Sequence, residues 1–394
     1  MSQASEAAAM PKTVDGVMAA AQQMAGLEDF GDLNFLDSLG RLLKAFQTEA
    51  DLSELGEQLA YGGVINNLVN RLRYVRDLKA HPEILEEKIE RPIVILGLPR
   101  TGTTKLQRVL SASPQALAME YWRMMNPAPF PGEEPGKPVE RIQMARDAVQ
   151  MLSENFPGFM ARHPTEAEVP DEEVLLMQGS FQCVVTWLFA HIPSFYEFCM
   201  NTNQRPLYDF LHGQMQYMQW QQGGAQGRSW IMKSPCHTGF IDTLLEVFPD
   251  AVFVHCHRDV NVVMPSMSGL TEEMRRIHSD QIDSSIIGPE MLDYFGTMMD
   301  RYIDLRERLP SERFMDVHYM EIMTNLEDVI ERAFALAGRK LDAETLANAQ
   351  QFDEERPQHY LGSYTYAAED YGFSQDMISA RFARYAKRFA EFNK

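Results

Sequence analysis

A glycine-rich stretch, "ILGLPRTGTT" at residues 95–104, carries the residue types that hold phosphate groups. A nucleotide-binding P-loop has two glycines separated by four residues, followed by Lys and then Ser or Thr. Gly97 and Gly102 have that separation, but Thr103 stands where the lysine is expected, and Thr104 follows it. Backbone N–H groups and a helix N-terminus would still form an anion cradle. The stretch therefore predicts a loop for an anion that does not need the lysine, with a structural strand–helix turn as the alternative.

Cationic and hydroxyl side chains recur in two later segments. "MKSPCH" contains Lys233, which could neutralise charge on a bridging oxygen, and His237, a residue type suited to proton transfer near neutral pH. "HRDVNVVMPS" contains Arg258 and Ser266, which could hold one phosphate, as could Arg100 of the first stretch. Taken singly, each has a structural alternative, such as a capping or core histidine or an ion pair at a helix start.

Each of these segments follows a stretch with strand character. The continuous apolar run before Gly97 suits a strand that is buried on both faces of a parallel sheet. Strand patterns cover or lie near Ile93–Leu96, Trp230–Met232, Val252–His255 and Arg313–Tyr319, with helical spacing after the loop, at Thr238–Phe248 and near Leu326–Leu336. We therefore expect an α/β fold, a P-loop-like parallel sheet with helices on both faces. Because ligands bind at the carboxyl ends of such strands, the three segments should share one crevice.

The rest of the chain reads as helical additions to this sheet. Residues 1–90 show apolar residues at helical spacing and are expected to form a helical N-terminal layer. No Gly/Ser linker follows, so this layer should pack on one large domain, residues 91–394. Within that domain, residues 111–227 form the largest insertion, which we expect to be mainly helical.

Composition excludes several classes of protein. The net charge of −20 over 394 residues argues against a nucleic-acid binder. The most apolar segment is too short to span a bilayer, and the N-terminus has no secretory pattern. Four cysteines without a CxxC pair fit a reducing cytoplasm. "HCH", at His255 and His257, supplies two imidazoles, too few to predict a metal site, so strand packing is the preferred interpretation.

The three segments, in this order, resemble the sulfotransferases that use 3′-phosphoadenosine 5′-phosphosulfate (PAPS), especially the bacterial branch with "GLPRTGTT" and "LKSPxH". The resemblance covers most of the chain. It implies that Arg258 and Ser266 bind the 3′-phosphate of PAPS. It also implies that the 5′-phosphosulfate is held by the loop residues Arg100, Thr101, Gly102, Thr103 and Thr104.

The resemblance also implies the catalytic groups. Lys233 would stabilise charge at the transferring group, and His237 looks like the catalytic base of the family. In the related tyrosylprotein sulfotransferases a glutamate at a position like that of Glu120 acts as the base. Glu120 is therefore a second candidate.

Two residues depart from the family pattern, and a lysine directly after the loop could be mistaken for the missing P-loop lysine. The family often has a glutamate after the tryptophan that matches Trp122, where this chain has Arg123. A histidine common near the C-terminus is matched by Tyr364. Lys105, directly after the loop, is expected to be a helix-surface residue rather than a replacement for the P-loop lysine.

The sequence thus predicts a PAPS-dependent sulfotransferase that needs no metal. It would move a sulfuryl group to the hydroxyl of a small apolar alcohol or phenol, giving a sulfate ester and 3′,5′-ADP, with residues 111–227 on the acceptor side. Two aromatic and Met-rich segments, residues 119–130 and 181–198, would line an apolar pocket, although core packing is the simpler reading. A P-loop kinase of a small alcohol and a catalytically inactive nucleotide-binding protein are the alternatives. A homodimer is one oligomeric state that the sequence leaves open.

Overall fold

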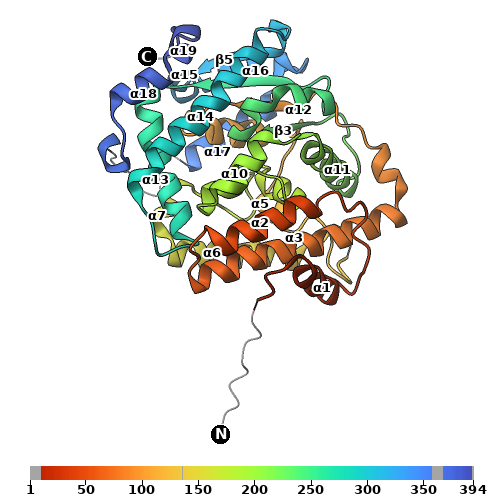
Figure 1. The fold of residues 1–394 in the computed structure, drawn as a ribbon. Coiled ribbons are helices and arrows are strands. Elements are labelled where there is room, and N and C mark those ends of the chain that lie inside the picture. Colours follow the sequence, from red (N-terminus) through yellow and green to blue (C-terminus); the bar gives the residue numbers. More distant parts are fainter. Residues whose placement is uncertain (1–9, 135, 357–366, 393–394) are drawn as a thin grey trace.

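A five-stranded parallel sheet forms the centre of the molecule (Figure 1), in a computed structural model that describes residues 10–134, 136–356 and 367–392. The strand order is β2-β3-β1-β4-β5. All neighbouring strands run parallel. The strands are β1 (Ile93–Leu96), β2 (Ala116–Leu117), β3 (Ser229–Lys233), β4 (Val252–His257) and β5 (Phe314–His318). The expected fold class is confirmed.

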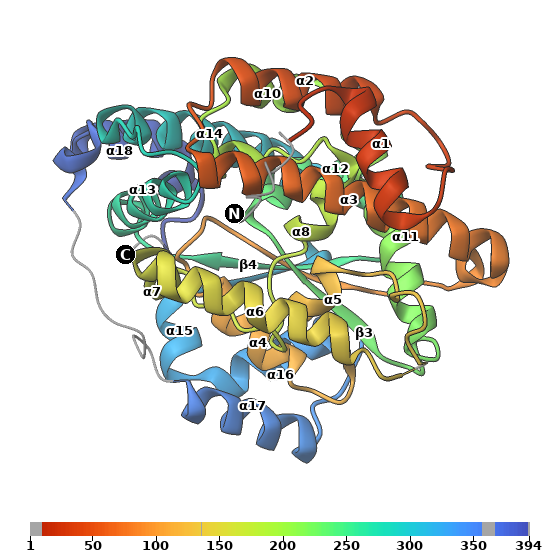
Figure 2. The ribbon, with the colours of Figure 1, turned by 90° about the horizontal axis from the view of Figure 1, so that it is seen from below.

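Helices cover both faces of this sheet, and β1 shows why its sequence is continuously apolar. Ile93 and Ile95 belong to one hydrophobic cluster, whereas Val94 and Leu96 belong to another. Because successive strand residues point to opposite faces, β1 needs apolar side chains at every position. Figure 2 shows β3 and β4 between two groups of helices, with α4 and α15–α17 on one side and α3 and α12–α14 on the other.

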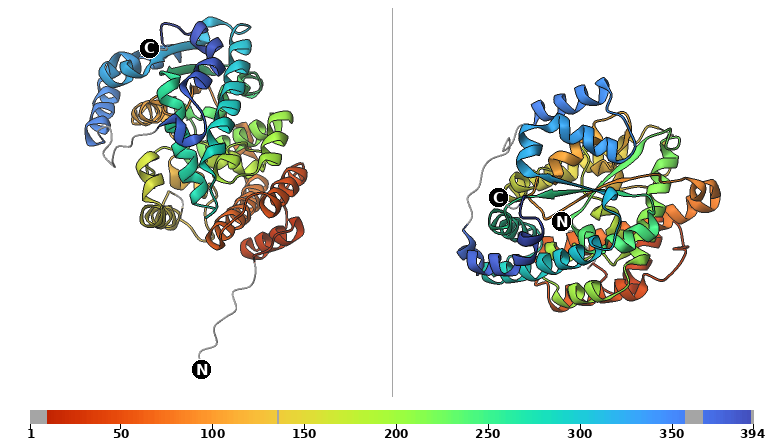
Figure 3. Two further views of the ribbon diagram at one scale, coloured as in Figure 1. Left: turned by 60° about the vertical axis from the view of Figure 1, so that its left-hand side comes forward. Right: turned by 90° about the horizontal axis from the view of Figure 1, so that it is seen from above.

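The N-terminal helices form a layer at the end of the molecule away from β5 and the C-terminal helices (Figure 3). Side-chain caps begin two of these helices, since Thr13 accepts from the Gly16 N–H and Ser53 from the Gly56 N–H. The layer shares one hydrophobic cluster with helices of the main domain. Its elements are α1 (Val14–Ala25), α2 (Leu36–Thr48), α3 (Glu54–Ala80) and the 3₁₀ turn η1 (Pro82–Glu86).

The segment after the loop is mainly helical, with one short strand that the sequence pattern did not predict. Strand β2 has two residues, which pair with Ser229 and Trp230, and so short a strand shows no periodicity. The helices are α4 (Thr103–Ser111), α5 (Tyr121–Met125), α6 (Val139–Asn155), α7 (Pro157–Arg162), α8 (Val174–Met177), η2 (Gln178–Ser180), α9 (Thr186–Phe189), α10 (Pro193–Asn201) and α11 (Arg205–Gln221).

The helix expected at Thr238–Phe248 is divided into a 3₁₀ turn and a shorter α-helix. A side chain at Gly239 would place its Cβ 2.5 Å from Met298 Sδ, so the backbone of the turn lies directly against α14. The remaining elements are η3 (Pro235–Phe240), α12 (Ile241–Val247), α13 (Val260–Arg276), α14 (Ser284–Arg306), η4 (Ser311–Arg313), α15 (Tyr319–Thr324), α16 (Leu326–Leu336), α17 (Ala343–Glu355), η5 (Ala368–Tyr371), α18 (Gln375–Arg381) and α19 (Ala383–Arg388).

Candidate active site

The glycine loop joins β1 to α4 in a conformation that its sequence requires. Gly97 and Gly102 have φ values of 124° and 89°, which favour glycine, and Arg100 has φ 67°. A Cβ on Gly97 would lie 2.4 Å from the carbonyl oxygen of Cys256, so the loop passes closely over the end of β4. Gly102 directly precedes α4. The loop therefore presents the N-terminus of α4 at the carboxyl edge of the sheet.

Two arginines and a serine from distant segments meet beside this loop. Arg100 Nε donates to Ser266 Oγ of α13 at 3.2 Å. Arg258, at the end of β4, donates through Nη1 to the carbonyl oxygen of Arg100 at 2.9 Å. Its guanidinium also lies 4.0 Å from the centre of the Tyr319 ring. The predicted phosphate-binding residues are thus brought together, and their assignment to the two phosphate positions stays a prediction.

Lys233 connects the loop helix to a carboxylate that the sequence reading missed. Its Nζ donates to Thr104 Oγ1 at 3.2 Å and to Glu172 Oε1 at 2.5 Å. The side chain of Lys233 is 1% exposed, whereas that of Glu172 is 19% exposed. Thr101 and Thr103 are buried within the loop and the first turn of α4. The ammonium therefore lies between the anion cradle and an accessible acid.

His237 is enclosed, and both of its ring nitrogens have partners. Nε2 lies 2.6 Å from Glu173 Oε1, and Nδ1 lies 2.9 Å from the Tyr208 hydroxyl. The side chains of His237 and Glu173 are fully buried. Burial raises the pKa of Tyr208 well above its ordinary value, so the phenol keeps its proton. Both ring nitrogens of His237 are therefore engaged by neighbouring side chains.

Glu120 lies at the start of α5 and is held by the residue that departs from the family pattern. Arg123 Nε donates to Glu120 Oε2 at 2.9 Å. The Arg123 guanidinium also lies 4.4 Å from the centre of the Trp122 ring. Arg123 thus binds an acid three residues earlier in the chain instead of supplying one itself.

Lys105 projects from α4 toward α17, where its ammonium lies 2.7 Å from Asp353 Oδ1. It therefore pairs on the helix surface, as expected, and contacts a helix on the outer face of the sheet. Tyr364 lies outside the described residues.

The sequence reading missed Glu172 and Glu173, although the chain carries a signal for them. "PDEEV", Pro170–Val174, puts three acids directly before an apolar helix in a chain whose predicted ligand is anionic. Glu173 Oε2 accepts from the backbone N–H of Lys233 at 2.9 Å, which fixes the end of β3. The two adjacent acids therefore bind different parts of Lys233. Glu173 accepts from its backbone N–H, and Glu172 accepts from its side-chain ammonium.

A cavity of about 400 Å³ opens beside these groups, and its wall is mostly apolar. Pro99 of the loop, Tyr121, His163, Asp171 and Glu172 contribute to this wall. Both aromatic and Met-rich segments contribute to it, with the N-terminal layer and α13–α14 supplying other parts of the wall. Apolar residues of the wall include Leu42, Phe46, Leu59, Val64, Met125, Met151, Phe159, Phe181, Val185, Leu188, Phe189, Met267, Leu270 and Phe295.

A histidine and an aspartate in the wall of this cavity form a pair. His163 Nε2 lies 3.2 Å from Asp171 Oδ1, and the same oxygen accepts from the Glu172 N–H at 2.7 Å. Burial opposes ionisation of Asp171, but the pair with His163 and the nearby charge of Arg108 outweigh it and lower the pKa of the carboxyl. Burial also raises the pKa of Tyr121 to about 12.

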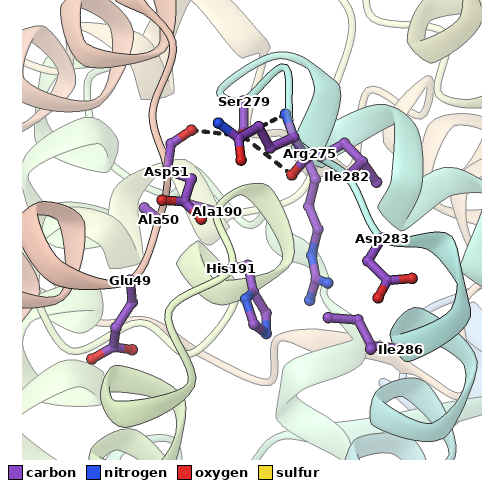
Figure 4. A pocket seen from close by; sticks show the side chains of 11 residues that line it. Glu49, Ala50, Asp51, Ala190, His191, Arg275, Ser279, Ile282, Asp283 and Ile286 are labelled. Carbon is purple, nitrogen blue, oxygen red and sulfur yellow. Dashed lines mark hydrogen bonds between the residues drawn. The ribbon is translucent and has the colours of Figure 1, made fainter.

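A second cavity, of about 370 Å³, lies between the α2–α3 connection and the start of α14 (Figure 4). Arg275 and His191 point into it, but both already bind Glu290, at 2.7 and 2.8 Å. Glu49, Asp51 and Asp283 add negative charge to its wall. A phosphate-bearing ligand therefore fits the loop better than this second cavity.

The "HCH" histidines meet an aspartate of the next strand. The β4–β5 register pairs His255 with Asp316, and one ligand atom each from His255, His257 and Asp316 lies within 4.8 Å of the others. Arg306 donates to both Asp316 oxygens, at 2.7 and 2.5 Å, so its guanidinium already balances the carboxylate. Burial lowers the pKa of both histidines and keeps them neutral. The three side chains thus pack around an ion pair in which a cation would have to displace Arg306, and the interpretation of "HCH" as strand packing stays a prediction.

All four cysteines are free and buried. None of the described helices combines the length and apolarity needed to cross a membrane.

Comparisons with known proteins point to one family. A family model described as "Sulfotransferase family" matches residues 92–343. The omega-hydroxy-beta-dihydromenaquinone-9 sulfotransferase Stf3 of Mycobacterium bovis and Mycobacterium tuberculosis is 28% identical over 267 residues, which is 63% of this chain. The aligned region spans 62% of the length of these curated relatives.

Two solved structures are similar over almost the whole chain. The sulfotransferase STF1 from Mycobacterium tuberculosis H37Rv is 29% identical, with a TM-score of 0.82 that covers 94% of this chain and 98% of that one. The sulfotransferase STF9 from Mycobacterium avium is 25% identical, with a TM-score of 0.86 and coverage of 96% and 97%. The agreement includes the N-terminal helices, which lie outside the region that the family model matches.

Proposed function

The chain belongs to the sulfotransferase family, and on this premise we propose that it is an enzyme that transfers a sulfuryl group from PAPS to a hydroxyl group. The acceptor is a small molecule with an apolar body, an alcohol or a phenol, and the products are a sulfate ester and 3′,5′-ADP. The observation that carries the proposal is the position of Lys233. It bonds to Thr104, in the first turn of α4 after the anion loop, and to Glu172, in the wall of an apolar cavity.

The groups around the loop fit the chemistry of this donor. The loop amides, the N-terminus of α4 and the hydroxyl of Thr104 can hold the 5′-phosphosulfate without a γ-phosphate to grip. Arg258 and Ser266, beside Arg100, are the groups that would hold the 3′-phosphate. Cations that are already oriented cost little reorganisation when charge gathers on the leaving phosphate, and Lys233 has that role.

The cavity supports an acceptor with an apolar body. Its volume of about 400 Å³ lies within the range of small-molecule sites, and its wall is mostly apolar. A hydroxyl placed beside Glu172 and Pro99 of the loop would meet the donor, while the rest of the molecule contacts α2, α3 and α13. The mycobacterial relative named above acts on an omega-hydroxy compound, which is the same arrangement of a hydroxyl on a larger body.

A binding experiment separates this proposal from a kinase. Thermal unfolding is followed with 3′,5′-ADP, 5′-AMP and ATP with magnesium. Because a ligand raises the melting temperature according to its concentration relative to Kd, 3′,5′-ADP should give the largest shift. A larger shift with ATP and magnesium would favour the kinase, and no shift with any nucleotide would refute the proposal.

A further inference from the structure

We propose that Glu172 is the catalytic base that takes the proton of the acceptor hydroxyl. This inference rests on the sulfuryl transfer proposed above and names a residue that the sequence motifs do not reveal. It also assigns the predicted base, His237, a supporting position instead.

Glu172 is the carboxylate that reaches both halves of the site. It lines the apolar cavity, and its Oε1 accepts from Lys233 Nζ, which also donates to Thr104 in the first turn of α4. Asp171 also lines the cavity, but its Oδ1 already accepts from the Glu172 N–H and lies beside His163. Glu172 therefore stands where an acceptor hydroxyl and the sulfur of the donor would meet.

The two predicted bases are placed less well than Glu172. Within the described part of the chain, neither His237 nor Glu120 contributes to the wall of the apolar cavity. His237 uses both ring nitrogens in bonds to Tyr208 and Glu173, and Glu120 is paired with Arg123.

His163 is the stronger rival. It lines the cavity, and if its Nε2–H donates to Asp171, its Nδ1 lone pair remains for a proton. It is tied to the loop only indirectly, because the carbonyl oxygen of its neighbour Arg162 accepts from Arg100 Nη1. The test must therefore compare Glu172 with His163 directly.

Binding of the donor would free the Glu172 carboxylate from Lys233. In the unliganded site the ammonium of Lys233 is shared between Glu172 and Thr104. An anionic donor in the loop attracts that ammonium, and the Glu172 carboxylate then accepts a hydrogen bond from the acceptor hydroxyl. A lone pair of the hydroxyl oxygen forms the new bond to sulfur. The bond from sulfur to the 5′-phosphate oxygen breaks with its electron pair left on that oxygen, and the proton passes to Glu172, which later gives it to water.

The experiment measures transfer from PAPS to an apolar alcohol, together with the affinity for 3′,5′-ADP. Glu172→Gln should lower kcat by about 10²–10⁴-fold. Its affinity for 3′,5′-ADP should be unchanged or higher, because the variant no longer competes for Lys233. Glu168→Gln is the matched control, since Glu168 is four residues away, exposed and paired with Arg146. It should retain full activity.

A merely structural role for Glu172 would not be repaired by a small carboxylate, so Glu172→Ala is assayed with added formate. Partial recovery of kcat, together with greater activity of Glu172→Asp than of Glu172→Ala, supports the base assignment. If Glu172→Gln stays within about threefold of wild type while His163→Gln loses activity, His163 is the base and the inference is overturned. An inactive Glu172→Ala that binds 3′,5′-ADP but is not rescued also overturns it. Absence of transfer by the wild-type protein would remove the proposed function, and this inference with it.

Discussion

Two clusters of acidic and basic side chains lie on opposite sides of β1, one at the end of β3 and one at the ends of β4 and β5, and their surroundings differ. The Lys233 cluster (Lys233, Glu172 and Thr104) faces a cavity and the N-terminus of α4. The His255 cluster (His255, His257, Asp316 and Arg306) is covered by aromatic rings, with Phe389 4.7 Å from His257 and Tyr302 4.6 Å from His255. Both contain residue types that can do chemistry. A ligand in the cavity can reach the Lys233 cluster, whereas aromatic rings cover the histidines of the His255 cluster.

Electrostatics sharpens the same contrast. In the His255 cluster the carboxylate is satisfied on both oxygens by Arg306, and the imidazoles are neutral. In the Lys233 cluster the ammonium is shared between the hydroxyl of Thr104 and the partly exposed carboxylate of Glu172. An incoming anion can therefore attract the ammonium of Lys233. The guanidinium of Arg306 is already bound to both oxygens of Asp316 and is not available in the same way.

Removing the ammonium of Lys233 tests the role of this cluster in catalysis. Lys233→Ala should lower kcat by about 10²–10³-fold, because a preoriented group that stabilises transition-state charge is lost. The measurement is steady-state transfer from PAPS. Lys105→Ala removes a lysine that pairs with Asp353 outside the site, and it should stay within about twofold. If kcat falls by less than tenfold in Lys233→Ala, Lys233 has no special role in transfer, and the Lys233 cluster does not differ from the His255 cluster in this respect.

In the His255 cluster the corresponding change should affect folding, not catalysis. Asp316→Asn leaves the Arg306 guanidinium without its counter-charge and should lower the free energy of unfolding by about 3 kcal/mol. Urea unfolding measures this, with Asp353→Asn as a control for a more exposed ion pair, expected to cost about 1 kcal/mol or less. The kcat of folded Asp316→Asn should match wild type within about twofold. A large loss of kcat at unchanged stability would show that this cluster is the functional one.

The donor side is tested through the 3′-phosphate. Arg258→Ala should weaken 3′,5′-ADP binding about tenfold or more, because charge-assisted hydrogen bonds contribute roughly 1.5–3 kcal/mol each. Binding of 5′-AMP, which lacks the 3′-phosphate, should change little. Calorimetric titration of both ligands gives the comparison. Equal losses for the two nucleotides would place Arg258 elsewhere.

The smallest effect is a pH dependence of stability that belongs to the buried histidines. Burial and then the neighbouring His257 lower the pKa of His255 in the folded protein. Below the ordinary histidine pKa of about 6.5, the unfolded chain binds protons that the folded chain does not, so stability falls as pH falls. His255→Phe should reduce this slope by roughly 1 kcal/mol per pH unit between pH 6.5 and 5. Unfolding curves at several pH values test it, and an unchanged slope would mean that His255 is charged.

The parts of the site that follow strands could be predicted from the sequence, because strand ends are local features. Lys233, Arg258 and the glycine loop each follow a short apolar run, and parallel strands bring such ends together. Glu172 could not be found this way, since it comes from an insertion about sixty residues before Lys233. The link depends on the contacts that Glu172 and Glu173 make with Lys233 just before α8, and the periodicity of the sequence does not indicate such contacts.

In the His255 cluster, too, the sequence indicated the histidines but not their partners. "HCH" suggested two imidazoles on one face of a strand, but the third partner depends on the β4–β5 register, which pairs His255 with Asp316. Arg306, on α14, then decides the character of the cluster. Similarly, the two-residue strand β2 exists only because β3 offers it a partner. Residue types could be read from the sequence, whereas the partners that set their charge and access could not.

Sulfuryl transfer itself is measured by incubating the full chain with PAPS that carries radiolabelled sulfur, together with apolar alcohols and phenols, with and without excess EDTA. We expect label in a sulfate ester, an equal amount of 3′,5′-ADP, and a rate that EDTA changes by no more than about twofold. Protein that binds 3′,5′-ADP but transfers no label to any acceptor would contradict this expectation. So would a rate that collapses with EDTA and is restored by magnesium.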